Sequence, residues 1–355
     1  DVEEARSAPG VVAVLTGSDL NPMVRENWWY MAGREAMYPP RTCLAEGDVR
    51  YVGDPIAIVI AESRYLAEDA ADLVQVDIEP AAPVLDVRAA MADGADLVHP
   101  ENGTNTPGVF PVVDDAEMEA AFRSAAHVVT ETFDQHRYLP VPMETRGIIG
   151  DWNPITGEMH IWNATQSAHE VRGFYARLLG LRENAVRVTN PDVGGGFGLK
   201  TFSLRDEWSV VLASRLLGRP VKWIEDRREN LMAGAGARDE SMTVSMALDE
   251  DGRILAMRAE NLENIGAYPF PGPATTGPLI AKYLSGPYRV PHIAYSGASV
   301  YTNTAGRAAY RGPFLMATVG PEQLVDVAAR RLGLDPLELR RRNVLHTSEL
   351  PFTMG

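Results

Sequence analysis

The feature that most constrains this chain is a run of glycines at residues 192–200, which read DVGGGFGLK. Three successive glycines remove every Cβ from one short segment, so the backbone can turn sharply and approach another group at van der Waals distance. Phe197 projects from this bare segment, and Gly198 follows it. On the motif alone two interpretations stay open: a tight connection between a strand and a helix, or a backbone surface shaped for a ligand.

Length and composition indicate a globular chain with more than one domain. The 355 residues favour two domains over one, and 45% hydrophobic residues suffice for a packed core. The longest uninterrupted apolar run, residues 55–61, is too short to span a bilayer. We therefore expect no transmembrane segment.

Charge and cysteine content exclude several classes of function. The net charge is −15, from 48 acidic and 33 basic residues, and repels nucleic acid and anionic lipid. Cys43 is the only cysteine, so this chain alone can form neither a disulfide nor a thiolate-held iron–sulfur or zinc site. A reducing compartment fits, and we expect a cytoplasmic protein. Any iron–sulfur cluster in its electron path has to lie on a partner.

Hydrophobic periodicity predicts a mixed α+β fold. The N-terminal part reads as a small α+β unit, with a buried strand at 56–60, a helix capped by Ser63 and an alternating strand at 76–80. A stretch rich in Asn, Gly, Thr and Pro follows. We therefore place a first domain at 1–105, a linker at 106–124 and a second domain at 125–355.

The second domain is predicted to alternate strands and helices. Strands are expected at 128–133, 150–152, 159–162, 186–188, 220–224, 242–248 and 254–256, and helices at 171–179, 204–216 and 320–333 and from 335 onward. The strands at 150–152 and 159–162 flank a turn and form a hairpin. The charged run at 225–229 is interpreted as a solvated turn.

Gln166 immediately precedes the clearest helix of the chain. Ser167 and Glu170 have the spacing of a capping box at its start. A primary amide at this position offers one acceptor oxygen and two donor hydrogens to a ligand. The alternative is a glutamine that satisfies a loop carbonyl, which is the commoner role.

Arg311 lies between an aromatic residue, Tyr310, and Gly312. It can present its guanidinium, or its backbone amide, to an anionic oxygen. The alternative is a surface arginine packed on Tyr310.

Taken together, the motifs resemble the molybdenum hydroxylases, a family that includes xanthine dehydrogenase, aldehyde oxidoreductase and carbon monoxide dehydrogenase. Residues 49–59 and 70–76 resemble the family's α/β hammerhead domain. The other matching motifs follow in the family's order at 165–166, 191–200, 218–223, 286–288, 301–304 and 310–312. The resemblance implies a hammerhead domain, N-terminally incomplete, followed by the first molybdopterin-binding domain of the xanthine dehydrogenase large-subunit type.

The resemblance also implies a cofactor and site residues. In this family a molybdopterin dithiolene, rather than a side chain, ligates molybdenum, so no metal ligand is expected here. By resemblance, Gln166 would hydrogen-bond an oxo ligand of the metal, Phe197 would pack beside metal and pterin, and Arg311 would contact the metal's oxygen ligands. These three are the expected catalytic residues. Further cofactor contacts are expected at Gly195, Gly196, Gly198, Tyr310 and Gly312, and substrate contacts at Thr201, Pro313 and Phe314.

Departures from the family pattern narrow the expected substrate. Purine-oxidising members carry a glutamate where Thr201 stands and an arginine near Leu279, so purine oxidation is not expected. The carbon monoxide enzymes carry a cysteine where Gly312 stands. An aldehyde or an aromatic N-heterocycle remains, and both stay open. The expected reaction inserts a water-derived oxygen at an electron-poor carbon, with hydride passing to the metal centre.

The resemblance implies partners as well. Family members continue into a second cofactor-binding domain, which supplies most pterin contacts and a general-base glutamate that no residue here matches. We therefore expect a second large-subunit half, in the same chain or on a partner, together with an iron–sulfur (2Fe-2S) subunit and a FAD subunit in a dimer of heteromers. The pterin is expected alone or as its cytosine dinucleotide.

Two other functions fit the sequence less well. A non-catalytic homologue or assembly subunit would keep the fold but would need none of Gln166, Phe197 and Arg311. A nicotinamide-dependent dehydrogenase would use the glycines for pyrophosphate. The segment lacks the G-x-G-x-x-G spacing, however, and no acidic residue ends a matching second strand.

Overall fold

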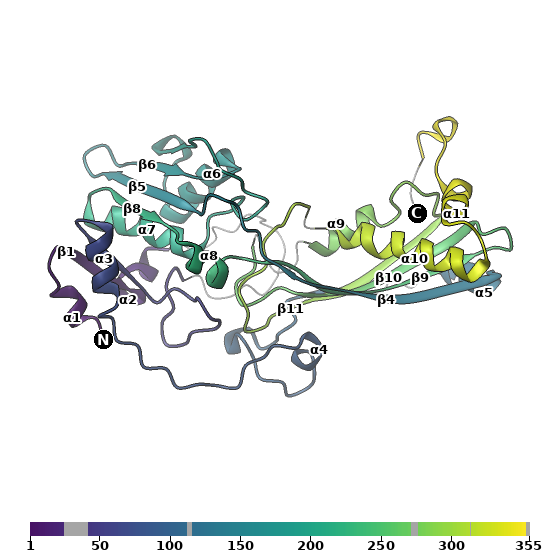
Figure 1. Ribbon diagram of the computed structural model, residues 1–355, viewed down its shortest axis with the longest axis horizontal. Coiled ribbons are helices and arrows are strands. Elements are labelled where there is room, and N and C mark those ends of the chain that lie inside the picture. The colour runs from purple at the N-terminus through teal and green to yellow at the C-terminus, as the bar shows by residue number, and fades with distance from the viewer. Residues whose placement is uncertain (25–41, 112–115, 271–275, 313, 353–355) are drawn as a thin grey trace.

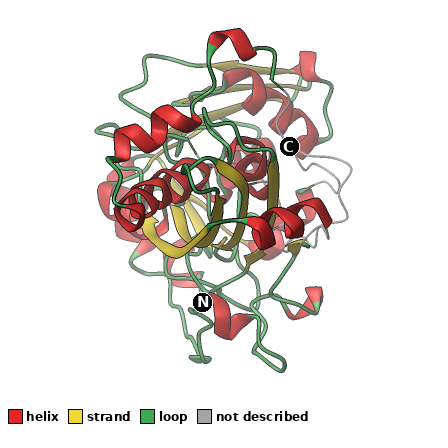
Figure 2. Ribbon diagram, turned by 90° about the vertical axis from the view of Figure 1, so that its right-hand side faces the viewer, coloured by secondary structure: helices red, strands yellow, loops and turns green. Residues whose placement is uncertain are grey.

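The computed structural model describes residues 1–24, 42–111, 116–270, 276–312 and 314–352. Figure 1 shows an elongated molecule with a group of helices and strands at each end and long strands that run between them. Seen along the long axis in Figure 2, the strands lie near the middle and helices surround them. None of the helices in these ranges has the length and apolar character that a bilayer crossing requires.

The N-terminal unit is built on an antiparallel pair of strands. Strands β1 (Val11–Thr16) and β2 (Ala57–Ala61) pair antiparallel, and α3 (Arg64–Ala71) packs on β2. The hydroxyl of Ser63 accepts a hydrogen bond from the Leu66 N–H, which confirms the predicted helix cap. Short elements complete the unit: α1 (Glu3–Arg6), α2 (Gly17–Leu20) and η1 (Asn21–Met23). The strand predicted at 76–80 is wrong, because residues 74–86 form neither helix nor strand before α4 (Val87–Ala90) and η2 (Pro100–Asn102).

A four-stranded sheet carries the two helices that flank the glycine run. Its order is β7-β6-β5-β8, with β5 (Gly147–Asn153), β6 (Glu158–Asn163), β7 (Val186–Thr189) and β8 (Val221–Ile224). The hairpin of β5 and β6 is confirmed. Helix α6 (Ala168–Leu179) and η3 (Glu183–Ala185) connect β6 to its parallel neighbour β7, and α7 (Arg205–Leu217) packs on β5. A Cβ on Gly150 would lie 3.1 Å from Val211 Cα, so glycine here permits the close approach of α7.

A five-stranded sheet forms the other end of the molecule. Its order is β3-β11-β10-β9-β4, with β3 (Gly108–Phe110), β4 (His127–Tyr138), β9 (Ala237–Leu248), β10 (Ile254–Asn264) and β11 (His292–Val300). Helix α10 (Met316–Leu332) packs on β9 and β4, with α9 (Thr276–Tyr283) and α11 (Pro336–Asn343) beside it, and η4 (Thr347–Glu349) follows (Figure 1). Met242, Val244 and Met246 of β9 are fully buried, as their period of two predicts.

Three local predictions need correction. The stretch predicted as a linker, 106–124, contains β3, which is an edge strand of the five-stranded sheet, and α5 (Ala116–Ser124), which packs on β10 and β11. Helix α10 begins at Met316 and includes Pro321, rather than beginning at Gly320. Ser167 is the N-cap of α6, but its side chain makes no capping hydrogen bond. The division into domains stays a prediction.

Candidate functional site

The glycine loop, as we call residues 192–200, connects β7 to the segment before α7. Gly195 and Gly198 have φ of 95° and 105°, in the left-handed region that suits glycine. Phe197 has a φ of 52°, which is rare for a bulky residue, and the residue is 44% exposed. The loop therefore holds an aromatic ring at the surface in a strained conformation, as occurs where the surrounding structure fixes a functional group.

The Gln166 side chain is bonded to the glycine loop. Its Oε1 accepts a hydrogen bond from the Gly198 N–H at 2.7 Å, and its own backbone N–H donates to the Lys200 carbonyl at 2.9 Å. A Cβ on Gly196 would lie 2.3 Å from that Oε1, so the close approach of the amide requires glycine. Because Oε1 is used in this way, the Nε2 group keeps two donor hydrogens, and no residue of the described chain accepts them.

Arg311 reaches the same loop from the other side. Its backbone N–H donates to the Phe197 carbonyl at 2.9 Å, and a Cβ on Gly198 would lie 2.3 Å from the Ala309 carbonyl oxygen. Arg311 itself has a φ of 43° and is exposed. Its guanidinium makes no hydrogen bond or ion pair with the residues that the structure describes. The structure thus brings Gln166, Phe197 and Arg311 together on one short segment.

Lys200, a buried cation at the end of the glycine loop, is linked through Glu144 to Gly194 of the same loop. Lys200 is 2% exposed, and its Nζ lies 2.6 Å from Oε2 of Glu144, which also accepts the Gly194 N–H at 2.8 Å. Desolvation raises the pKa of Glu144, but the hydrogen bonds from Lys200 and Gly194 outweigh it, so the pKa lies below its ordinary value. The Lys200 carbonyl accepts from Gln166, so this lysine holds both the loop and the glutamine.

Arg146, two residues after Glu144, is buried among three carboxylates and fixes the start of α7. Its guanidinium donates to Asp206 and Glu225 at 2.7 Å each, and Glu207 lies 3.4 Å away. Burial raises the pKa of Glu207 to about 7 in spite of the nearby Arg146 charge.

The charged run at 225–229, which was interpreted from the sequence as a solvated turn, is partly buried and partly helical. Glu225 is 1% exposed and pairs with Arg146, and Asp226 and Glu229 form a capping box at the start of α8 (Arg227–Ala233). A buried guanidinium needs a carboxylate partner, which explains why this acidic residue leaves the solvent.

Of the remaining residues expected at the site, some lie at the glycine loop and others do not. Tyr310 stacks on Tyr138 with ring centroids 6.2 Å apart, and the Thr201 N–H donates to the Gly198 carbonyl at 3.2 Å. Gly312 has a φ of 93°, with open space where a Cβ would lie. Phe314 packs with Tyr283 of α9 at 5.0 Å and joins the core of the five-stranded sheet rather than the loop. Pro313 lies outside the described residues.

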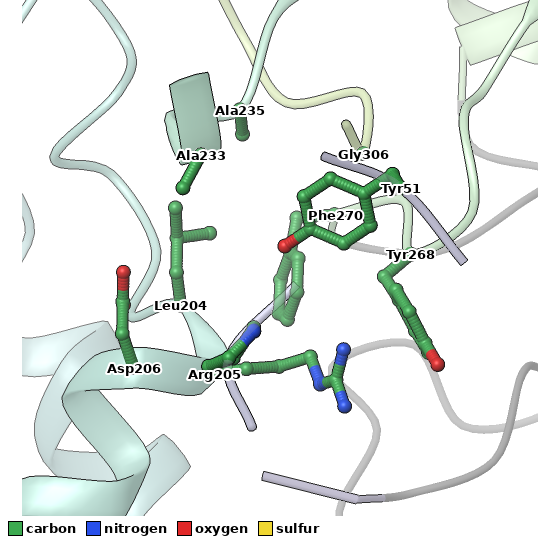
Figure 3. A pocket seen from close by; sticks show the side chains of 10 residues that line it. Tyr51, Leu204, Arg205, Asp206, Ala233, Ala235, Tyr268, Phe270 and Gly306 are labelled. Carbon is green, nitrogen blue, oxygen red and sulfur yellow. The ribbon is translucent and has the colours of Figure 1, made fainter. Parts of the chain in front are cut away.

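A small cavity away from the glycine loop is lined both by residues of the N-terminal unit and by the start of α7 (Figure 3). Arg205 crosses it between Asp54, 2.5 Å away, and the ring of Tyr268, whose centroid is 3.9 Å from the guanidinium carbon. Burial raises the pKa of Tyr51, which also lines it. None of Gln166, Phe197 and Arg311 lines this cavity. It belongs to the contact between the two units, not to the glycine loop.

Sequence reasoning missed the residues that support the site. Lys200 ends the glycine motif and is the one supporting residue with a local signal. Nothing near Glu144 or Arg146 in the sequence indicates their roles, because their partners lie 56 and 79 residues away.

Fold and site together define an α+β cofactor-binding protein with a hammerhead unit. Residues 1–82 match the aldehyde oxidase and xanthine dehydrogenase a/b hammerhead domain, and residues 98–344 match the molybdopterin cofactor-binding domain. The chain belongs to the molybdenum hydroxylase family of molybdopterin-binding large subunits. The predicted family and fold class are confirmed.

Relatives of known name agree with this assignment. The chain is 36% identical to the nicotine 6-hydroxylase large subunit of Paenarthrobacter nicotinovorans, over 99% of this chain and 43% of that protein. It is 34% identical to the carbon monoxide dehydrogenase large chain of Afipia carboxidovorans, over 99% of this chain and 45% of that protein. The structure of quinoline 2-oxidoreductase from Pseudomonas putida 86 superposes with a TM-score of 0.90 at 36% identity, over 100% of this chain and 45% of that one. The chain thus spans less than half the length of these relatives.

Proposed function

We propose that this chain forms the part of a molybdenum hydroxylase large subunit that holds the molybdenum end of molybdopterin. The observation that carries the proposal is the meeting of Gln166, Phe197 and Arg311 on the glycine loop. Both polar side chains keep donor groups without partners among the described residues, and they flank a backbone that carries no Cβ at 194–196. A scaffold protein has no need of this arrangement.

The residues present fit such a cofactor. Molybdopterin is anionic and rich in oxygen, and an amide N–H and a guanidinium are donors that suit anionic oxygens. The glycines at 195 and 196 let a flat ring system approach the backbone, and Gly196 leaves room for the Gln166 amide. The Arg311 charge offsets some of the repulsion that a chain of net charge −15 exerts on an anion.

In this proposal, bound molybdopterin supplies the oxidation of an electron-poor carbon with oxygen from water. Gln166, held in place by the Gly198 N–H, would donate from Nε2 to an oxygen of the cofactor. Arg311 would contribute positive charge toward the anionic group. The exposed Phe197 ring would pack against the bound cofactor and exclude water there, which would strengthen both interactions.

An aromatic N-heterocycle is our preferred substrate, with an aldehyde as the second choice. Two relatives carry names of enzymes acting on such rings, nicotine 6-hydroxylase and quinoline 2-oxidoreductase. Thr201 is neutral and directly follows the glycine loop, with its N–H bonded to the Gly198 carbonyl, and it would contact an uncharged ring. Phe314 and Pro313 remain proposed substrate contacts, although Phe314 packs into the neighbouring core.

We further propose that the chain works within a larger complex. The names of relatives, such as "large subunit" and "complex subunit gamma", support an assembly of several subunits. In it we place a second large-subunit half, a 2Fe-2S subunit and a FAD subunit, as a dimer of heteromers in the cytoplasm. The pterin would be present as its cytosine dinucleotide. The proposed domains are 1–105 and 125–355, with 106–124 between them.

The test is metal and pterin analysis of the native complex, followed by an activity screen. The purified complex should contain about one molybdenum per large subunit and should oxidise an N-heterocycle with an artificial dye as electron acceptor. A folded native complex that lacks molybdenum, or a loaded one inactive on every heterocycle and aldehyde, would contradict the proposal.

A further inference from the structure

Backbone strain in the described part of the chain is concentrated near the glycine loop. Four non-glycine residues there have a left-handed φ: Phe197 at 52°, Arg311 at 43°, and the neighbours Arg238 and Asp239 at 68° each. Such conformations are unfavourable for residues that carry a Cβ and persist where neighbouring contacts enforce them. Two of the four belong to the proposed site. The other two, at the start of β9, have no assigned role.

The contacts of Arg238 lead directly to Arg311. Its Nη2 donates to the carbonyl of Tyr310 and its Nη1 to the carbonyl of Gly312, both at 2.8 Å. One guanidinium therefore binds the two carbonyls on either side of Arg311. The planar group holds both at once, which a lysine ammonium at the end of a flexible chain would not do as rigidly.

Arg238 is itself fixed and kept away from the solvent. It is 4% exposed. Just before it, Gly236 donates to the Gly306 carbonyl at 3.1 Å and accepts from the Ala308 N–H at 2.7 Å, which ties the start of β9 to the segment that leads to Tyr310. The Arg238 guanidinium also lies 5.6 Å from the centre of the Tyr310 ring. The residue thus acts on the protein rather than on a ligand.

The effect of Arg238 extends to the aromatic ring of the site. The Arg311 N–H donates to the Phe197 carbonyl, so a shift of residues 310–312 also moves the glycine loop. With its guanidinium unpartnered among the described residues, Arg311 takes its direction from its own backbone. Arg238 holds the carbonyls of Tyr310 and Gly312, which lie on either side of Arg311, and so restricts the φ of Arg311.

We propose that Arg238 is a positioning residue, which holds the carbonyls of Tyr310 and Gly312 so that the Arg311 guanidinium faces the bound cofactor. This rests on the proposed function, since it assigns a direction to Arg311 within the molybdopterin site. Arg238 binds the peptide groups that flank Arg311, and Arg311 binds the cofactor.

The experiment compares Arg238→Met, Arg238→Lys and a control in the native complex. Three quantities are measured: molybdenum per large subunit, the electron paramagnetic resonance spectrum of Mo(V), and kcat and KM with a dye acceptor. Arg215→Met is the control, because Arg215, in the last turn of α7, donates to the Leu179 carbonyl at the end of α6 at 2.7 Å. It should leave the Mo(V) spectrum and kcat as in the wild type.

For Arg238→Met we expect molybdenum within about twofold of the wild type, a shifted Mo(V) spectrum and a kcat lowered about 10- to 100-fold, with KM changed less than about threefold. Arg238→Lys retains one of the two hydrogen bonds and should recover part of kcat. It also serves as the decisive variant if Arg238→Met does not assemble.

Two results would overturn the positioning role alone. One is a molybdenum-loaded variant with the wild-type spectrum and kcat. The other is an Arg238→Lys complex that assembles without molybdenum, because Arg238 would then serve retention of the cofactor rather than the direction of Arg311. A wild-type complex without molybdenum would instead refute the proposed function, and the positioning role with it.

Discussion

The side-chain oxygen of Gln166 accepts the backbone N–H of Gly198 at 2.7 Å, across 32 residues of sequence. This bond fixes which end of the amide faces outward, because an oxygen that accepts from the loop leaves Nε2 as the free donor. A glutamine at a helix entrance thereby becomes a directed donor group. The loop group that the side chain bonds is an N–H and not a carbonyl, which favours the proposed donor role over a glutamine that satisfies a loop carbonyl.

Gln166→Ala in the native complex should lower turnover about 10- to 100-fold, because it removes both the outward donor and the bond that holds Gly198. Molybdenum content and kcat check this prediction. Gln323→Ala is the matched control, since Gln323 is an exposed residue of α10. Unchanged turnover in Gln166→Ala with every substrate tested would favour the non-catalytic alternative.

Gly198→Ala should destabilise the protein and displace the segment 309–312, which contains Arg311. The new Cβ would lie 2.3 Å from the Ala309 carbonyl oxygen, and the residue would keep a φ of 105°. Gly94→Ala is the control, because Gly94 has a φ of 78° with open space where a Cβ would lie. The control carries only the conformational cost, about 1 kcal/mol, and Gly198→Ala should exceed it. Thermal unfolding midpoints that fall equally in both variants would contradict the steric argument.

Arg146→Met should lower the free energy of unfolding by about 3–5 kcal/mol, because it leaves the buried Glu225 and Glu207 without their cation. Arg331→Met removes an exposed pair with Glu131 and should cost about 0–1 kcal/mol. Chemical denaturation of the two variants measures the difference. Similar costs would show that burial of the Arg146 cluster contributes nothing beyond an ordinary surface pair.

Glu240→Gln should change how stability depends on pH. Burial and the neighbouring Glu263 charge raise the pKa of Glu240 to about 8, well above the value of about 4.3 in an unfolded chain. Between these values the folded state holds a proton that the unfolded state releases. The wild type therefore loses about 1.4 kcal/mol of unfolding free energy from this residue per unit rise in pH.

The variant keeps an amide oxygen for the Asn261 donor, which lies 3.3 Å away, and loses the titration. It should be more stable than the wild type at pH 8, and the gap should close toward pH 5. Glu260→Gln, at an exposed position of the neighbouring strand β10, is the control and should show no such gap. Unfolding midpoints measured across this range decide the matter, and a gap that is independent of pH would refute the assigned pKa.

Local patterns were enough to predict most elements of the second unit. The β5–β6 hairpin, the buried face of β9 and the glycine ends of α6 and α7 depend on residues close in sequence, where period and turn chemistry act directly. The strand predicted at 76–80 failed because alternation alone does not supply a pairing partner. The start of α10 was predicted too late, because proline is favoured in the first turn of a helix. The helix instead begins at Met316 and contains Pro321 in its second turn, without the hydrogen bond that an N–H at this position would donate.

The sequence by itself determined the family, the bare glycine loop and the three residues that meet on it, because glycine content and motif order are readable without contacts. The tertiary structure alone decided what holds them in place. Arg238 reaches the carbonyls of Tyr310 and Gly312 across 72 and 74 residues, and Lys200 reaches Glu144 across 56. Such pairings arise only when distant segments fold against one another, where burial removes water as the competing partner and makes each hydrogen bond specific.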